Sequence, residues 1–258
     1  MQANVVAGGL GSRMGALTRR TPKPLLAPPG CRPLLGYIVD ALVAVGVIRL
    51  MVCVGLALAA DAIRGYLDQH FQGIAIDYVT APPRGVGFAV HQCRARVQDE
   101  VPLLLTMADV VCPQGYAPLI RALDRVDLAL AVSAAGPDPD KHYTGARIAA
   151  DGEPALQSPE NGATAGRPLV GVYAIRPVQA FFQILHDGID AVEQQRTTAA
   201  EAVTLGVMNP KGEYRLSFAV QALADTGRAT ALVDIGPVVE VNRPDHLVGA
   251  ASLLRSPR

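Results

Sequence analysis

Short apolar segments of β type alternate with segments of helical spacing along the first half of the chain. Five runs read as strands, at residues 3–7, 48–54, 74–79, 103–107 and 128–134. Helical patterns fill four intervals, at residues 33–45, 57–71, 87–97 and 115–123. This alternation predicts an α/β fold with a mixed, mostly parallel central sheet flanked by helices. Several runs are apolar at every position, so both faces of the sheet should be covered.

The pattern changes after Gly136. A Pro-, Asp- and Gly-rich stretch comes first, and then a hairpin-like passage at 143–156 that turns at Asp151 and Gly152. The remaining segments indicate a strand at 169–175, helices at 178–194 and 215–226, a strand at 229–233 and a helix near 245–254, with 194–212 as a surface loop containing some helix. We expect one domain over residues 1–258, whose two halves, 1–135 and 136–258, share one sheet.

Charge is balanced, with 23 basic and 23 acidic side chains, and half of the residues are apolar. No global field therefore attracts nucleic acid or an anionic membrane. Residues 34–60 are nearly all apolar, but Asp40, Gly46 and Arg49 interrupt them, which indicates a core helix and a buried strand. No charged segment and cleavage site precede the first apolar run, so we expect a cytoplasmic protein.

A glycine-rich loop follows the first predicted strand. It reads Ala7-Gly8-Gly9-Leu10-Gly11-Ser12-Arg13, and Thr21-Pro22-Lys23-Pro24-Leu25 comes shortly after. Glycines let backbone N–H groups approach phosphate oxygens closely, and Arg13 and Lys23 add positive charge. A dinucleotide-binding loop would need a third glycine where Met14 stands, and the Gly-Lys-Ser/Thr of a Walker A loop is absent from the sequence. The loop is predicted to hold phosphate by another arrangement.

A carboxylate follows the predicted strand at 103–107. Asp109 comes directly after Ala108, at the carboxyl end of the strand, where ligands collect in open α/β sheets. A carboxylate there is suited to Mg²⁺, although strand-end aspartates also cap the next helix. We expect Asp109 in the same crevice as the glycine loop.

The glycine loop reads G-G-x-G-S-R, and P-K-P-L follows ten residues beyond the arginine. This pattern resembles the signature of the sugar-1-phosphate nucleotidylyltransferases, which have a Rossmann-like fold. The resemblance implies that the loop wraps the triphosphate and base. It also implies that Arg13 contacts the departing pyrophosphate and that Lys23 holds the α-phosphate. It also implies that Asp109 binds Mg²⁺, with Ala108 where the family usually has glycine. The implied nucleotide-binding residues of these two segments are Ala7, Gly8, Gly9, Gly11, Ser12 and Ala108.

Two segments near the C-terminus resemble the family's second metal ligand. Asn242 lies in Val-Glu-Val-Asn-Arg-Pro-Asp-His-Leu, whereas Asp234 begins an Asp-Ile-Gly sequence that other members use. We favour Asn242 because the sequence after it matches the helix start that normally follows the ligand. Asp245 is then predicted to be the N-terminal cap of that helix.

The family reads the base partly through a G-T-x-x-A-like segment. Gly85, Val86 and Gly87 occupy that place, with valine for threonine, which leaves the identity of the base open. The same glycines could instead start a helix. The segment is predicted to contact the nucleotide.

Acceptor contacts are implied by two further segments. Tyr143, Gly145 and Arg147 resemble a Y-G segment of the sugar pocket, and Gly171 with Tyr173 resembles a G-x-Y segment. Glycine lets a hydroxylated ring approach the backbone, and tyrosine offers a ring face and a hydroxyl. Ordinary strand packing is the alternative explanation for both.

One departure from the family concerns the acceptor phosphate. The lysine of a Glu-Lys-Pro segment commonly binds it, but the best register here places Ser158 at that position. Either another cation, such as Arg147, Arg167 or Lys141, replaces the lysine, or the acceptor differs from an ordinary hexose 1-phosphate.

The predicted function is transfer of NMP from an NTP to a sugar 1-phosphate, with Mg²⁺ as cofactor and pyrophosphate as product. Residues 1–135 would bind the nucleotide and residues 136–258 the small phosphorylated acceptor, in a protein that could form a homo-oligomer. Alternatives are a cytidylyltransferase acting on a phosphoalcohol or phosphonate, and a non-catalytic nucleotide-sugar-binding regulatory homologue. A dinucleotide-binding oxidoreductase is disfavoured by Met14.

Overall fold

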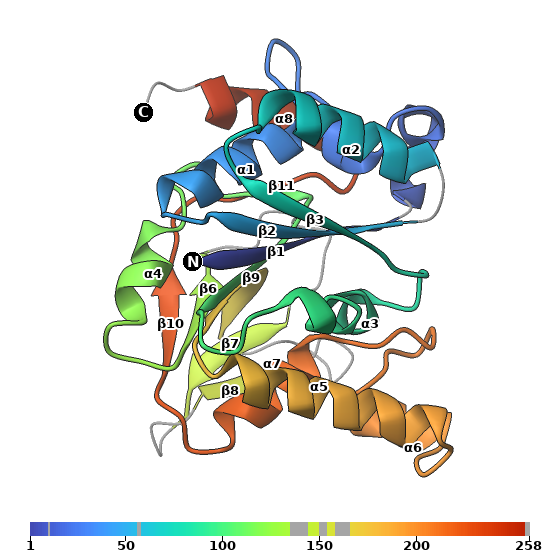
Figure 1. The fold of residues 1–258 in the computed structure, drawn as a ribbon, viewed down its shortest axis with the longest axis vertical. Helices are drawn as coiled ribbons and strands as arrows, with labels where there is room; N and C mark the ends of the chain where they lie inside the picture. Colours follow the sequence, from blue (N-terminus) through green and yellow to red (C-terminus); the bar gives the residue numbers. More distant parts are fainter. Residues whose placement is uncertain (10, 56–57, 135–143, 150–153, 158–165, 256–258) are drawn as a thin grey trace.

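A computed structural model describes residues 1–9, 11–55, 58–134, 144–149, 154–157 and 166–255 (Figure 1). Its strands are β1 Gln2–Ala7, β2 Arg49–Val54, β3 Ala75–Thr80, β4 Leu103–Met107, β5 Val110–Val111, β6 Leu128–Val132, β7 Gly145–Ile148, β8 Pro154–Gln157, β9 Arg167–Ile175, β10 Thr230–Asp234 and β11 Val239–Glu240. The α-helices are α1 Leu34–Ala44, α2 Leu58–His70, α3 Val86–His91, α4 Ala117–Ala122, α5 Val178–Glu193, α6 Ala199–Thr204, α7 Ser217–Ala224 and α8 Pro244–Arg255. Three segments are 3₁₀ helices, η1 Ser12–Arg19, η2 Lys23–Leu25 and η3 Arg94–Arg96.

One mixed sheet runs through the molecule in the order β10-β6-β9-β4-β1-β2-β3. β1 is parallel to β2 and β4, β2 to β3, and β10 to β6, whereas β9 is antiparallel to both β4 and β6. β7 extends the sheet beside β9, and β8 pairs with β7. The α/β fold class with a mostly parallel sheet is thus confirmed, and both halves of the chain contribute strands.

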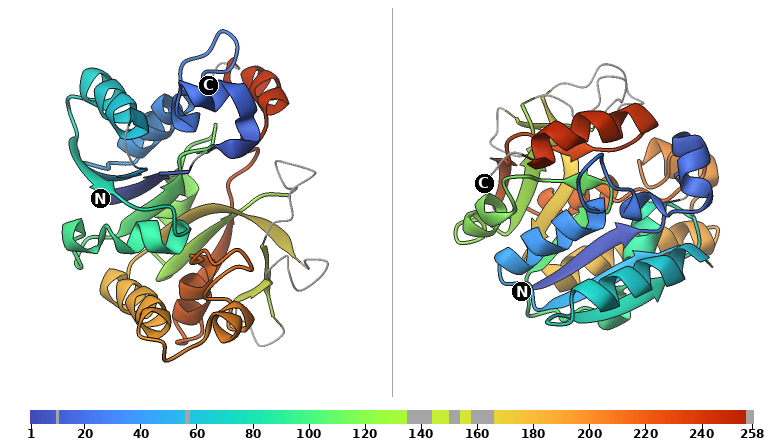
Figure 2. Two further views of the ribbon diagram at one scale, coloured as in Figure 1. Left: turned by 90° about the vertical axis from the view of Figure 1, so that its right-hand side faces the viewer. Right: turned by 90° about the horizontal axis from the view of Figure 1, so that it is seen from above.

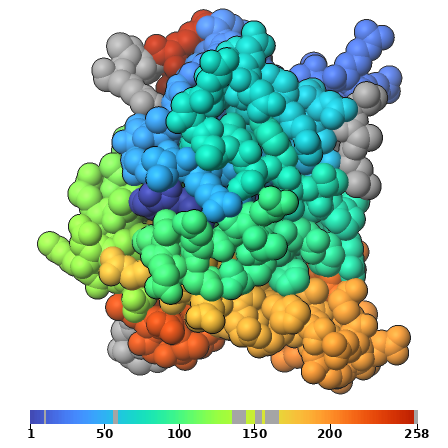
Figure 3. Space-filling view, in the orientation of Figure 1, coloured from blue at the N-terminus to red at the C-terminus, as the bar shows by residue number. Residues whose placement is uncertain are grey.

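Side chains of the central strands alternate between two cores. In β4, Leu104 faces one core and Leu103 and Leu105 face the other, and all three are fully buried. α1, α2, α4 and α8 cover the first core, and α3, α5, α6 and α7 cover the second (Figure 1). Figure 3 shows the corresponding surface, with blue and cyan N-terminal segments at one end and the orange α5 and α6 segment at the other. Continuously apolar strands are therefore explained by burial on both faces.

Local structure differs from the sequence expectation in several places. The helix expected at 87–97 ends at His91, and η3 follows it. The helix expected at 115–123 begins only at Ala117. By contrast, α6 agrees with the expectation that residues 194–212 form a surface loop containing some helix. η1 and η2 were not expected, because a short 3₁₀ segment leaves little periodic signal. The hairpin is confirmed by the antiparallel pairing of β7 with β8, and its turn at Asp151 and Gly152 lies outside the described residues.

The C-terminal part of the chain returns to the N-terminal half of the molecule. β11 pairs antiparallel with β5, and α8 then lies beside η1 (Figure 2). α8 begins at Pro244, so Asp245 lies in the first turn and accepts a hydrogen bond from Arg243 Nε at 3.4 Å. The expectation that Asp245 caps the helix was wrong, because proline at the first helical position moves the start one residue earlier. Among the described residues, no helix has both the length and the apolar character needed to cross a membrane.

We predict that Leu104→Ala lowers the free energy of unfolding by about 2–5 kcal/mol, because it leaves a cavity in the centre of the sheet. Leu205→Ala is the matched control, since Leu205 is 67% exposed, and it should change stability by less than about 0.5 kcal/mol. Urea denaturation followed by circular dichroism measures both. Equal effects of the two substitutions would contradict the described core.

Candidate active site

The glycine loop turns sharply from β1 into η1. Gly11 has φ of 63°, and a Cβ atom there would lie 2.9 Å from Cγ2 of Thr18. Thr18 Oγ1 donates to the carbonyl of Gly11 at 3.0 Å, and the N–H of Met14 donates to the same carbonyl at 2.8 Å. Both the conformation and the crowding require glycine at this position. The turn brings Arg13 to the start of η1.

Four side chains from distant parts of the sequence meet beside this loop. Lys23 Nζ lies 2.5 Å from Oδ2 of Asp109 and 3.3 Å from Oδ1 of Asn242. Arg13 donates to the same Oδ1 atom of Asn242 at 3.2 Å. The side chains of Lys23 and Asp109 are only 11% and 26% exposed, and Asn242 is buried. The expected convergence of the loop, the lysine and the strand-end carboxylate is present in the structure.

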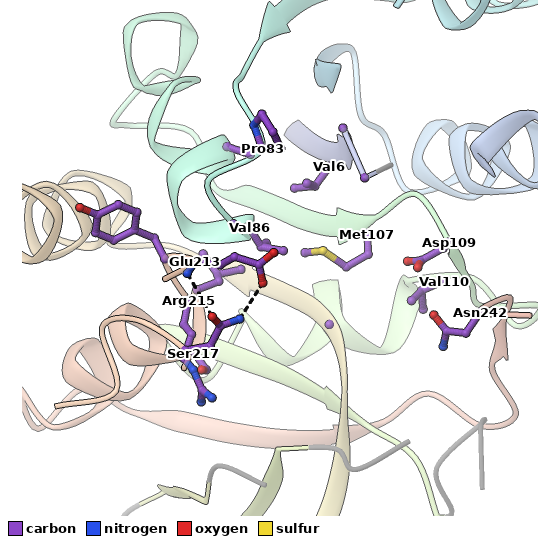
Figure 4. A pocket seen from close by; sticks show the side chains of 18 of the residues that line it. Val6, Pro83, Val86, Met107, Asp109, Val110, Glu213, Arg215, Ser217 and Asn242 are labelled. Atoms are coloured by element: carbon purple, nitrogen blue, oxygen red, sulfur yellow. Dashed lines mark hydrogen bonds between the residues drawn. The ribbon is translucent and has the colours of Figure 1, made fainter. Parts of the chain in front are cut away.

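The sheet and the returning C-terminal segment produce this convergence. β1 and β4 are adjacent parallel strands, with Val6 opposite Met107, so the glycine loop and Asp109 leave the sheet at the same edge. The N–H of Ala108 donates to the carbonyl of Val6 at 3.0 Å, and the N–H of Val241 donates to the carbonyl of Asp109 at 3.2 Å. Figure 4 shows Asp109 and Asn242 together at one end of the pocket. A two-residue ladder is thus sufficient to bring Asn242 to the site.

Asp234, the alternative to Asn242, lies elsewhere. It ends β10, which is separated from β4 by β6 and β9, a displacement of about 14 Å at the usual strand spacing. Asp234 forms an ion pair with Arg167 and accepts the N–H of Gly236 at 2.8 Å. The Gly236 N–H and the Arg167 guanidinium hold the pKa of Asp234 below its usual value. Of the two candidates, only Asn242 lies in the cluster with Asp109.

The donor set of the cluster fits a hard cation. A carboxylate oxygen of Asp109 and the amide oxygen of Asn242 already face one positive group, the ammonium of Lys23. Oxygen atoms in this arrangement are the ligands that Mg²⁺ takes, usually with only one or two carboxylates and with substrate phosphates. Among the described residues, no three His, Cys, Asp or Glu side chains form a metal-binding group. The oxygens of Asp109 and Asn242 fit such a cation as two of its ligands.

A pocket of about 610 Å³ opens from this cluster, and a smaller one of about 350 Å³ shares Gly9, Arg13 and Asp109 with it. Both sizes fall near the range of small-molecule sites. Predicted site residues that line the larger pocket are Gly8, Gly9, Gly11, Ser12, Arg13, Gly85, Val86, Asp109, Gly171, Tyr173 and Asn242. Three more, Ala7, Lys23 and Ala108, line the smaller one.

Some predicted residues do not line the described pocket. Gly145 is buried in β7, and Arg147 on the same strand is exposed. Gly87 lies behind the pocket wall, where a Cβ atom would come within 2.3 Å of the carbonyl oxygen of Arg215. Tyr143, Lys141 and Ser158 lie outside the described residues, and Arg167 is paired with Asp234. Neither Arg147 nor Arg167 lines the described pocket.

Gly171 and Tyr173 lie on β9 and line the same pocket as the glycine loop. Gly171 has φ of 75°, and a Cβ atom there would lie 3.1 Å from Cγ of Met107. Tyr173 is buried, and burial raises the pKa of its phenol above the usual value. The hydroxyl therefore stays protonated near neutral pH and can donate or accept a hydrogen bond.

One wall of the pocket was missed by the sequence analysis. It is the segment from Asn209 to Ser217, which includes Glu213 and Arg215 (Figure 4). Asn209 Nδ2 donates to Glu213 Oε2 at 2.6 Å, and Glu213 N–H donates to Asn209 Oδ1 at 3.0 Å. The Pro and Gly residues at 210 and 212 signal a turn, but no local pattern indicates that the turn faces a pocket.

Solved structures of nucleotidyltransferases share this fold. The TM-score is 0.77 for a putative glucose-1-phosphate thymidylyltransferase from Bacillus anthracis, at 16% identity and with 100% of this chain and 96% of that one covered. At this identity the likeness is one of fold. The fold is that of the nucleotidyltransferase class.

The chain belongs to the family described as the MobA-like NTP transferase domain, whose model matches residues 3–199. The UTP–glucose-1-phosphate uridylyltransferase AglF of Haloferax volcanii is 26% identical over 241 residues, or 91% of this chain and 88% of the relative. The D-glycero-alpha-D-manno-heptose 1-phosphate guanylyltransferase of Campylobacter jejuni is 31% identical over 105 residues, or 40% of this chain and 46% of the relative, so the match spans less than half of its length. A 2-aminoethylphosphonate cytidylyltransferase of Lancefieldella rimae is 47% identical over 74 residues, which cover 29% of this chain and 28% of the relative. The resemblance to sugar-1-phosphate nucleotidylyltransferases is confirmed, and enzymes of this kind generally depend on a divalent metal.

We predict that Gly87→Ala lowers the free energy of unfolding by about 1–3 kcal/mol, because the added methyl group meets the backbone of Arg215. Gly65→Ala is the control, since Gly65 lies exposed in α2 with open space around its Cα. It should instead stabilise the protein by about 0.5–1 kcal/mol. Urea denaturation distinguishes the two, and a stabilising Gly87→Ala would mean that the wall does not touch this loop.

Proposed function

We propose that the protein transfers a nucleoside monophosphate from an NTP to a sugar 1-phosphate, releasing pyrophosphate and forming an NDP-sugar. The observation that supports this most directly is the meeting of Arg13, Lys23, Asp109 and Asn242 beside the glycine loop. A triphosphate needs several cations and N–H donors in one place, and this cluster with its loop offers both. The adjoining pocket leaves room for an acceptor.

The reaction is an in-line displacement at the α-phosphorus. An oxygen of the acceptor phosphate forms the new P–O bond while the bond to the bridging oxygen of pyrophosphate breaks. The attacking phosphate is already ionised near neutral pH, since its second pKa is about 6, so no general base is required. Catalysis then depends on alignment and on neutralising charge.

Each element of the cluster has a defined part in this reaction. Backbone N–H groups of Gly8, Gly9 and Gly11 bind the triphosphate, and Arg13 binds the departing pyrophosphate. Lys23 holds the α-phosphate in line, exchanging its contact with Asp109 for one with the substrate. Asp109 and Asn242 would hold Mg²⁺, which supplies positive charge to the phosphate oxygens when bound.

A cytidylyltransferase that acts on a phosphonate is a second candidate. The local identity of 47% to a 2-aminoethylphosphonate cytidylyltransferase favours it, although only 29% of this chain is covered. The relative that covers 91% of the chain acts on glucose 1-phosphate according to its name, which favours the sugar 1-phosphate. The two candidates share the nucleotide chemistry and differ only in the base and the acceptor.

A pyrophosphate-release screen separates these candidates. UTP, CTP, GTP and dTTP are each combined with sugar 1-phosphates, phosphocholine and 2-aminoethylphosphonate, with and without Mg²⁺. We expect release that requires both an NTP and an acceptor, and the productive pair identifies the base and the acceptor class. A regulatory homologue would bind a nucleotide sugar without turnover, and this outcome would contradict the proposal.

We predict that Lys23→Ala lowers kcat by more than about 100-fold, because it removes a cation at the reacting phosphate. Asp109→Ala should abolish metal-dependent pyrophosphate release. Both variants should keep the circular dichroism spectrum of the native protein. Arg121→Ala and Asp187→Ala are controls at exposed positions outside the pocket lining and should retain full activity. Normal turnover in Lys23→Ala or Asp109→Ala would refute the assigned roles.

A further inference from the structure

The loop that leads into α3 is joined by its backbone to the pocket wall formed by the segment from Asn209 to Ser217. The N–H of Tyr214 donates to the carbonyl of Arg84 at 2.8 Å, and the N–H of Gly87 donates to the carbonyl of Tyr214 at 3.0 Å. Gly85 has φ of 99°, and a Cβ atom there would lie 2.4 Å from the carbonyl oxygen of Tyr214. The two segments are 130 residues apart in sequence and in direct backbone contact.

Side-chain interactions stabilise the same backbone contact. The Tyr214 side chain is 1% exposed, and its hydroxyl donates to Oε1 of Glu193, at the end of α5, at 2.5 Å. Arg84 donates to Oε2 of the same carboxylate at 3.2 Å. The guanidinium of Arg84 also lies 4.4 Å from the centre of the Phe88 ring, which stacks on Tyr214 at 5.9 Å. Glu193 therefore links α5, the loop before α3 and the pocket wall.

The ionisation states of Tyr214 and Glu193 favour the hydrogen bond between them. Burial and the neighbouring Glu193 raise the pKa of Tyr214 to about 12, so the hydroxyl remains a donor at neutral pH. Hydrogen bonds from Arg84 and Tyr214 hold the pKa of Glu193 below its usual value, so it remains a charged acceptor. Hydrogen bonds between a neutral donor and a charged acceptor are stronger than those between neutral groups.

Both joined segments line the larger pocket. Gly85 and Val86 line it on the side of α3, and Glu213 and Arg215 line it on the side of the wall (Figure 4). Tyr214 lies between Glu213 and Arg215, so its position determines where the wall stands relative to the loop. We propose that Tyr214 is a positioning residue, which through Glu193 holds the Gly85–Val86 side and the Glu213–Arg215 side of the pocket at the separation that both substrates require. This inference rests on the proposed nucleotidyl transfer and assigns to Tyr214 a role beyond it.

Steady-state kinetics with the productive NTP and acceptor test the proposal. Tyr214→Phe keeps the ring and its stacking but removes the hydroxyl, and Glu193→Gln removes the charge at a side chain that is 42% exposed. Tyr78→Phe is a matched control, because Tyr78 donates to Asp68 at 2.6 Å and lies under Arg64 at 4.9 Å, away from the pocket. All three changes keep the shape of the remaining side chain, and thermal melting verifies that each variant folds.

We expect Tyr214→Phe and Glu193→Gln each to raise the KM values of both substrates by about five- to tenfold, with kcat changed less than about twofold. The reacting phosphates are held by Arg13, Lys23 and Asp109, which lie on other elements, so the chemical step should be preserved. The double variant should be no worse than the more affected single variant, since Tyr214→Phe removes the same hydrogen bond that Glu193→Gln weakens. Tyr78→Phe should match the native enzyme in both constants.

Unchanged KM values in Tyr214→Phe and Glu193→Gln would overturn the proposal. A rise for one substrate alone would overturn it as well, because Tyr214 would then position only one side of the pocket. Additive losses in the double variant would show that the two residues act separately, which also contradicts it. If the native protein releases no pyrophosphate with any NTP and acceptor, the proposed function fails, and this outcome is distinguishable because it appears before any substitution is made.

Discussion

The contact of the Lys23 ammonium with the oxygens of Asp109 and Asn242 holds the candidate active site together. The three side chains come from η2, from the turn after β4 and from the second residue after β11. A carboxylate that is only 26% exposed needs a partner charge nearby, and Lys23 supplies it. The same ammonium is then in place to meet a phosphate. One ion pair thus organises the site and prepares it for an anionic ligand.

Strand direction explains why these residues meet and others do not. β1 and β4 are parallel neighbours, so the glycine loop and Asp109 emerge at one edge of the sheet. β10 points the same way, but β6 and β9 lie between it and β4, so Asp234 at its end is far from the cluster. Asn242 reaches the cluster because the short β11 pairs with β5 directly after Asp109. Topology therefore selects one of two similar sequence segments as the partner of Asp109.

Features that depend on local pattern could be predicted from the sequence. The strands of the first half follow from their apolar runs, and the glycine loop, Lys23 and Asp109 follow from a motif and a strand end. α6 had a usable signal, since Thr198 and Glu201 form a capping box at its start. The contact of Tyr214 with Gly85 could not be predicted, because it joins segments 130 residues apart through backbone atoms that carry no sequence signal. The structure shows that the glycines at 85 and 87 permit this close approach, whereas the sequence alone does not indicate it.

Binding of a paramagnetic cation tests the central claim, that the cluster receives a triphosphate together with its cation. Mn²⁺ is titrated into the protein in the presence of a non-hydrolysable NTP analogue, and electron paramagnetic resonance measures the bound fraction. We expect Mn²⁺ to bind the native protein with nucleotide at least about tenfold more tightly than it binds Asp109→Ala with nucleotide, because that variant lacks the only carboxylate proposed as a ligand. Equal affinity of the native protein and Asp109→Ala would contradict the account.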